Sequence, residues 1–113
     1  MTDSSIDLAV FAELKEATGD EFVSELVVTF LDEATQILSD LRQAVANADA
    51  ESYRRAAHSI KSNANTFGAE TLAELARKIE LGPLPEGGDM TDADALDAEF
   101  QRSAQALRNL IND

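Results

Sequence analysis

The sequence predicts an all-α protein, an antiparallel up-down-up-down four-helix bundle with a short extra N-terminal helix. Composition is the first reason, because the 113 residues include only 2 prolines and 5 glycines and 44% of them are hydrophobic, which is typical of helical globular chains. Periodicity is the second reason. Apolar residues recur at steps of three and four through most of the chain, and no segment alternates with period two over a useful length. Helices with one apolar stripe and mostly short connections favour a bundle.

The first two expected helices differ in length, and the short one is expected to pack across one end of the bundle. Its apolar face ends near Gly19, and Asp20 then has the character of an N-cap for a much longer helix. The face of the short helix consists of Ile6, Val10, Phe11 and Leu14. The stripe of the long helix continues for about seven turns and consists of Val23, Leu26, Val27, Phe30, Ala34, Ile37, Leu38, Leu41, Val45 and Ala48.

A third helix is expected to begin after Asp49, which is a suitable capping residue. Its apolar residues are spaced 4, 3, 4 and 3 apart and are Tyr53, Ala57, Ile60, Ala64 and Phe67. Gly68 follows this stripe. Glycine is expected there because a left-handed backbone at a helix C-terminus disfavours a side chain, so the predicted role of Gly68 is structural.

The fourth helix is expected to end at the sequence LGPLPEGG, residues 81–88, which is the one obvious long loop. Its apolar residues are Leu72, Leu75, Ala76 and Ile79. Thr91 and Asp94 then resemble a capping box, with Asp in place of Glu, at the start of the last helix. The apolar residues of the last helix are Leu96, Phe100, Ala104, Leu107 and Ile111.

Length and composition limit the possible functions. Residues 1–113 are expected to form one domain. A net charge of −13, from 22 acidic and 9 basic residues, argues against nucleic acid or an anionic membrane surface as a partner. No apolar run approaches the roughly 20 residues of a membrane span, and the polar start MTDSSID is not a secretory signal, so cytoplasmic residence is expected. The bundle has enough helices to close as a monomer.

The surroundings of the only histidine, His58, are unusual in so acidic a chain. No acidic residue occurs between Glu51 and Glu70. On a helix, His58 lies about 100° from the buried stripe, so its imidazole is expected to reach water. The residues one helical turn away, and the next residue along the same ridge, are polar or cationic: Arg54, Arg55, Lys61, Ser62 and Asn65.

This setting suits an anion on or near the imidazole. A phosphoryl group on a ring nitrogen would bring negative charge and several acceptor oxygens, which Lys61 can reach from one helical turn away. The middle of a helix offers no free N–H groups, so side chains must supply the positive field. The plainer alternative is an ordinary surface histidine, with Arg54 and Arg55 relieving charge repulsion or pairing with Glu51.

Other chemistries find less support in the sequence. One histidine and no cysteine give no metal-ligand pattern. Serine-type catalysis needs a nucleophile, a base and an orienting acid, and although Ser59 and Ser62 are near His58, local carboxylates are absent. There is no Gly-rich phosphate loop or other nucleotide signature. We therefore expect no ATP site in this chain and no bound metal or cofactor.

The residues from His58 to Glu80, HSIKSNANTFGAETLAELARKIE, resemble the signature of histidine phosphotransfer (HPt) domains. The matching positions are His58, Ile60, Lys61, Ala64, Phe67, Gly68, Ala69, Leu72, Leu75 and Glu80. The resemblance covers about residues 6–82, including the long helix upstream. The chain departs from the pattern at Ser62, where the family commonly has glycine, and at Asn63, where it commonly has serine. The departure at Ser62 leaves transfer rate and partner choice open.

The resemblance implies a phosphocarrier that holds a phosphoryl group on His58 and exchanges it with aspartates of response-regulator receiver domains. A hybrid sensor kinase is a further expected partner. The receiver would contribute the Mg²⁺ and most of the catalytic machinery for in-line transfer, so this chain is expected to be no enzyme by itself.

The resemblance also implies roles for residues around His58. Lys61 would balance the charge of the phosphoryl group. The supporting residues would be Ser62 and Asn65 as hydrogen-bond donors, and Arg54 and Arg55 as cations that steer the acidic receiver pocket. The residues expected to dock the receiver are Val10, Phe11, Leu14 and Phe22, and core packing is the alternative role for each of these four.

Two other interpretations stay open. The chain could be a non-catalytic helical adaptor, or a degenerate HPt domain that binds a receiver without phosphotransfer. It could also be the dimerisation domain of a sensor kinase, which carries a helical phosphohistidine too. In such domains the residue after the histidine is usually acidic, whereas here it is Ser59, and we expect no ATP-binding domain to follow.

Overall fold

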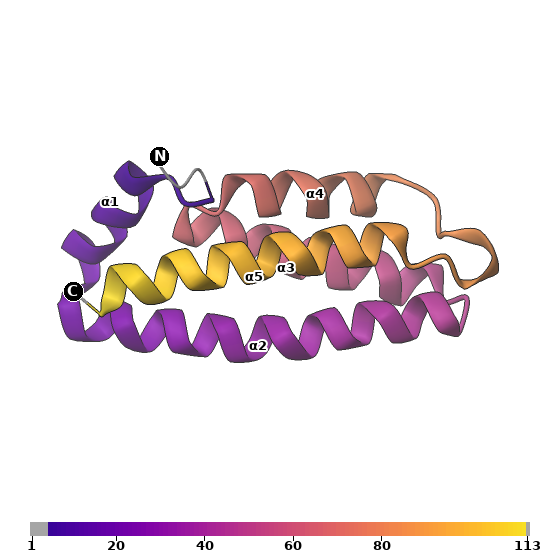
Figure 1. Cartoon of the computed structure of the whole chain (residues 1–113), viewed down its shortest axis with the longest axis horizontal. Coiled ribbons are helices and arrows are strands. Elements are labelled where there is room, and N and C mark those ends of the chain that lie inside the picture. Colours follow the sequence, from indigo (N-terminus) through magenta and orange to yellow (C-terminus); the bar gives the residue numbers. More distant parts are fainter. Residues whose placement is uncertain (1–4, 113) are drawn as a thin grey trace.

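A computed structural model describes residues 5–112 of the chain, and within that range the regular structure is entirely helical. The helices are α1 (Leu8–Thr18), α2 (Asp20–Ala46), α3 (Ala50–Phe67), α4 (Glu70–Leu81), the 3₁₀ turn η1 (Glu86–Gly88) and α5 (Thr91–Ile111). Figure 1 shows α2, α3, α4 and α5 lying lengthwise with alternating directions, while α1 crosses one end. The predicted four-helix bundle with a short extra helix is confirmed.

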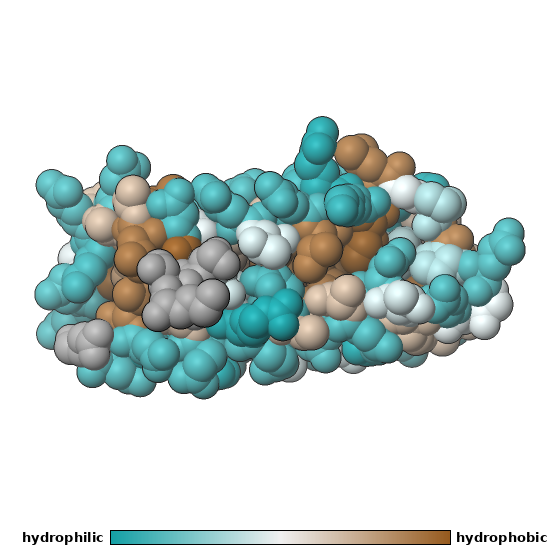
Figure 2. All heavy atoms as spheres, turned by 45° about the horizontal axis from the view of Figure 1, so that its top comes forward, coloured by the Kyte–Doolittle hydropathy of each residue, from teal (hydrophilic) through white to brown (hydrophobic). Residues whose placement is uncertain are grey.

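The core of the bundle is built from the apolar stripes that the spacing predicted. The stacked rings of Phe30 and Phe67, with centroids 4.8 Å apart, join α2 to α3. Phe100 of α5 meets Phe30 edge to face at 6.2 Å. Such pairs add about 0.5–1.5 kcal/mol each to the burial of their area. Figure 2 shows that hydrophilic side chains cover most of the visible outer face, with hydrophobic areas near its left end and to the right of its centre.

The turn between α3 and α4 is held by the segment that precedes α1. Gly68 has the predicted left-handed backbone, with φ 79° and ψ 16°. Its carbonyl accepts a hydrogen bond from the N–H of Asp7 at 2.7 Å. A Cβ atom at Gly68 would lie 2.8 Å from the carbonyl oxygen of Asp7. Glycine is therefore required here by both its backbone conformation and this close approach.

Helix capping follows the prediction at one position and departs from it at two. The carboxylate of Asp49 accepts from the N–H of Ser52 at 3.1 Å, so this cap is confirmed. The N-cap prediction for Asp20 is wrong, because Gly19 holds that place with a positive φ of 92°, and Asp20 is the first residue of α2. Its carboxylate still lies at the positive end of the helix dipole, where an acid is favourable.

The capping box predicted at the start of α5 is also wrong. The acceptor is Asp89, two residues before Thr91, and its carboxylate accepts from the Thr91 N–H at 3.0 Å and hydroxyl at 2.6 Å. Thr91 is consequently the first helical residue and not the cap. The chain approaches α5 through the loop after α4, and that path brings an earlier carboxylate to the helix start.

Candidate phosphohistidine site

Helix α3 presents His58 on its outer side. The predicted apolar stripe of this helix is buried, and it consists of Tyr53, Ala57, Ile60, Ala64 and Phe67. Burial of the stripe fixes the rotation of the helix, and the His58 side chain is left 57% exposed. The prediction that the imidazole reaches water is confirmed.

A carboxylate from the neighbouring helix lies against His58. The Nδ1 atom of His58 is 2.7 Å from Oε2 of Glu80 in α4, and the other oxygen of Glu80 accepts a hydrogen bond from Lys61 Nζ at 2.6 Å. Glu80 thus joins the histidine to the lysine. The expectation that carboxylates are absent around His58 is wrong, because it considered only neighbours along the chain, and antiparallel packing brings Glu80 across from 22 positions later.

The charge of Glu80 decides which ring nitrogen of His58 carries a proton. The hydrogen bond from Lys61 and, after it, the one from His58 lower the pKa of Glu80, although burial opposes them. Glu80 is therefore an ionised carboxylate at neutral pH, and such a group only accepts hydrogen bonds. In a neutral imidazole Nδ1 must then be the protonated nitrogen, and Nε2 keeps its lone pair. Among the described residues, Nε2 of His58 has no hydrogen-bond partner.

The remaining predicted residues share the ridge with His58 but differ in their contacts. Arg55 is paired with Glu51 on its own helix, as the plainer alternative proposed. Arg54 is exposed and forms no ion pair with any described residue. Ser62 and Asn65 are exposed as well. These side chains form one polar surface on α3 around the imidazole.

Comparison with known proteins agrees with this geometry. The family model for the Hpt domain matches residues 25–110. This chain belongs to the Hpt domain family. Members of the family are phosphocarriers and not kinases, and they work with receiver domains and sensor kinases. The matched residues include His58, Lys61 and Glu80 but neither α1 nor the first turn of α2.

One known protein is similar to this Hpt domain in sequence, and one solved structure is similar to it in fold. It is 32% identical over 82 residues to the sensor protein TorS of Escherichia coli K12; these residues are 73% of this chain and 9% of TorS. The crystal structure of histidine-containing phosphotransfer protein B (HptB) from Pseudomonas aeruginosa PAO1 superposes with a TM-score of 0.76 at 29% identity. That match covers 98% of this chain and 94% of HptB, so the fold extends through α1.

The residues expected to dock a receiver are not equally available in the Hpt domain. Phe22 is 51% exposed, whereas Val10 and Leu14 are half-buried. Phe11 is 4% exposed. Its prediction as an exposed docking residue is wrong, because α1 lies across the bundle end and turns this ring into the core. For Phe11 the alternative of core packing is the correct one.

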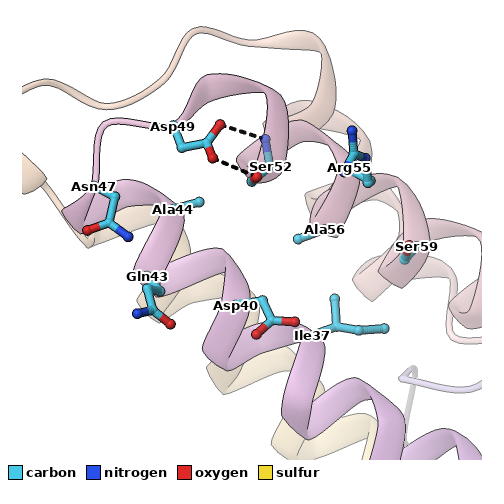
Figure 3. Close-up of a pocket in the computed structure, with 10 residues that line it drawn as sticks. All are labelled: Ile37, Asp40, Gln43, Ala44, Asn47, Asp49, Ser52, Arg55, Ala56 and Ser59. Atoms are coloured by element: carbon cyan, nitrogen blue, oxygen red, sulfur yellow. Dashed lines mark hydrogen bonds between the residues drawn. The ribbon is translucent and has the colours of Figure 1, made fainter.

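A groove lies between α2 and α3 of the Hpt domain, and its lining includes Ser59, the residue after His58. It encloses about 380 Å³, and its wall on α3 includes Arg55, Ala56 and Ser59, while Ile37 and Asp40 line it from α2 (Figure 3). The groove is open and mixed in polarity. No group of three or more possible metal-ligating side chains occurs among residues 5–112, and no helix in this range is long and apolar enough to cross a membrane.

Proposed function

We propose that this chain is a histidine phosphotransfer protein of a multistep two-component phosphorelay. His58 carries the phosphoryl group and exchanges it with aspartates of response-regulator receiver domains. The observation that carries the proposal is the hydrogen bond from His58 Nδ1 to the ionised carboxylate of Glu80, on an exposed ridge of an Hpt fold. Membership of the family supports the same conclusion.

The tautomer of His58 makes Nε2 the nucleophile. Its lone pair attacks the phosphorus of the receiver's aspartyl phosphate, so the N–P bond forms as the bond from phosphorus to the aspartate oxygen breaks, and the aspartate leaves as a carboxylate. No proton has to move, because Nδ1 keeps its hydrogen. The phosphorylated ring then carries a positive charge, which the adjacent Glu80 carboxylate stabilises. The reverse reaction follows the same path.

Lys61 can donate hydrogen bonds to the phosphoryl group while it donates one to Glu80. Its ammonium has three donors, of which one is used on Glu80 at 2.6 Å, and its side chain remains 26% exposed. The donors that remain are available to phosphoryl oxygens on His58, one helical turn away. Ser62 and Asn65, exposed on the same ridge, are proposed as additional donors.

The partner supplies what this chain lacks. A receiver domain brings the phosphorylated aspartate and the Mg²⁺ that neutralises charge during transfer, and a hybrid sensor kinase is the proposed upstream source of phosphate. We propose that the chain itself has no ATP site and binds no metal or cofactor. It acts as a cytoplasmic monomer.

The test is transfer from a receiver. The chain is incubated with phosphorylated receiver domains of its source organism and Mg²⁺, and bound phosphate is assayed for lability in acid and stability in base. We expect such label on the wild-type chain and none on His58→Gln. Label that persists in His58→Gln, or no label from any receiver, contradicts the proposal. Receiver binding without label would instead indicate a degenerate domain that acts as an adaptor.

A further inference from the structure

The cations of this chain divide into paired and unpaired ones. Of the 9 Lys and Arg residues, five have a carboxylate partner within 4 Å, namely Lys15, Arg42, Arg55, Lys61 and Arg102. The four with no ion pair to a described residue are Arg54, Arg77, Lys78 and Arg108. In a chain with 22 acidic residues, an unpaired cation is available to a partner molecule.

Arg77 is the unpaired cation that lies beside the phosphohistidine site on α4. It precedes Glu80 by one helical turn, and it lines the same groove between α3 and α4 as Lys61 and Asn65. The groove is open and encloses about 270 Å³. Arg54 precedes His58 by one turn on α3. The two unpaired arginines therefore approach the site from two different helices.

The α3–α4 groove has a charge gradient along its length. Glu70 and Glu74 line its end near the start of α4, and Arg77 lies nearer the end at which Glu80 bonds Lys61. Glu74 is one helical turn from Arg77, yet the two form no ion pair in this structure. The guanidinium is thus free to donate its fork of N–H groups to carboxylates outside the chain.

We propose that Arg77 is a contact that steers an acidic partner pocket to the phosphohistidine site and that it shares this role with Arg54. The occupant is the carboxylate-lined, Mg²⁺-binding pocket of a receiver domain, so the inference rests on the proposed function above. A protein pocket that holds Mg²⁺ is built from carboxylates, and a cation near its rim accelerates encounter. The sequence predicted Arg54 and Arg55 as the steering cations. Because Arg55 is paired with Glu51, we infer that Arg77 takes the role expected of Arg55.

The neighbouring residue Lys78 provides a matched control. It has the same charge and helix as Arg77, but it lines the opposite groove, between α4 and α5, with Leu75, Ile79 and Asp92. Arg77→Glu and Lys78→Glu therefore change the net charge of the chain equally, and they alter different faces of α4. Circular dichroism verifies that both variants remain helical.

The experiment measures binding and transfer separately. Stopped-flow mixing with a fluorescently labelled receiver gives the association rate, and single-turnover phosphotransfer at saturating receiver gives the rate within the complex. At about 50 mM salt we expect Arg77→Glu to slow association about 3- to 10-fold and Lys78→Glu to slow it less than about 2-fold. At about 500 mM salt the variants should converge, because screening shortens the range of the interaction. Arg77→Lys should retain most of the wild-type rate.

Each outcome separates this inference from the proposed function. Equal slowing by Arg77→Glu and Lys78→Glu in a chain that transfers phosphate normally overturns the role of Arg77 alone. A slower transfer rate within the saturated complex, with association unchanged, also overturns it. If the wild-type chain binds a receiver but takes no phosphate, the proposed function fails, and the difference between the two variants in binding still decides this inference. A chain that binds no receiver overturns both.

Discussion

Replacing Glu80 with glutamine tests the chemistry of the phosphohistidine site most directly. The carboxylate uses one oxygen on His58 at 2.7 Å and the other on Lys61 at 2.6 Å. A glutamine amide has only one oxygen, so it cannot accept from both partners in this geometry. If that oxygen faces Lys61, the amide N–H group faces Nδ1 of His58, and the imidazole must move its proton to Nε2.

The expected size of the effect follows from that conflict. Where a carboxylate orients a metal-ligating histidine, replacing the carboxylate typically lowers metal affinity or activity by about 10- to 100-fold, and we take this range as the guide for Glu80 and His58. The lower end applies here, because the His58 side chain is 57% exposed and water can replace part of the interaction. We therefore expect phosphotransfer from a receiver to Glu80→Gln to be about tenfold slower than to the wild type at neutral pH.

Two measurements check this reasoning. Quench-flow kinetics at saturating receiver gives the rate of transfer, and the ¹⁵N chemical shifts of the His58 ring report which nitrogen is protonated. The matched control is Glu74→Gln, because Glu74 is an exposed acid of the same helix with no hydrogen bond to the site. A wild-type transfer rate in Glu80→Gln, or an unchanged Nδ1–H tautomer, would refute the role given to Glu80.

Three further predictions concern stability and docking. The pKa of Glu80 lies below the ordinary value of 4.5, above all because Lys61 donates a hydrogen bond to it. The stability that Glu80 adds is therefore complete above pH 4.5 and is lost as the pH falls through the lower pKa of the folded state. In urea titrations the difference in free energy of unfolding between wild type and Glu80→Gln should shrink as the pH is lowered from about 6 to about 3. Phe11→Ala should lower the free energy of unfolding by about 3 kcal/mol because the ring is buried. Phe22→Ala should change the free energy of unfolding by less than about 0.5 kcal/mol and weaken receiver binding. Equal stability of the two variants would contradict the burial of Phe11. Gly68→Ala should lower the free energy of unfolding by about 2 kcal/mol, because residue 68 has a left-handed backbone and the added Cβ would meet the carbonyl oxygen of Asp7. Gly87→Ala should lower it less, because φ is positive there too but nothing lies within 4 Å of the added Cβ. Thermal unfolding of the two variants compares these effects.

The sequence predicts most of what lies on a single helix. The stripe from Tyr53 to Phe67 determined both the rotation of α3 and the exposure of His58, because a helix repeats every 3.6 residues wherever it packs. The capping prediction at Asp49 was confirmed, but those at Asp20 and Thr91 were wrong. Which residue caps a helix depends on the path of the chain just before that helix, and the spacing of apolar residues does not predict this path.

Contacts between helices could not be predicted in the same way. Whether Glu80 faces His58 depends on how far α4 slides along α3, and the sequence around His58 shows only that acids are missing nearby. The signal that pointed to Glu80 was its place at the end of the HPt signature. The misassignment of Phe11 has a similar origin, since the burial of a short helix depends on the surface that it meets.

The attachment of α1 has a consequence for where this module should be divided. The stretch recognised by the family model begins at residue 25, yet the backbone N–H of Asp7 is bonded to Gly68 and the ring of Phe11 is enclosed by the bundle. A fragment trimmed to the recognised stretch would leave the Gly68 carbonyl without this donor and uncover the apolar surface beneath Phe11. The unit defined by shared sequence is thus smaller than the unit that these backbone and core contacts hold together.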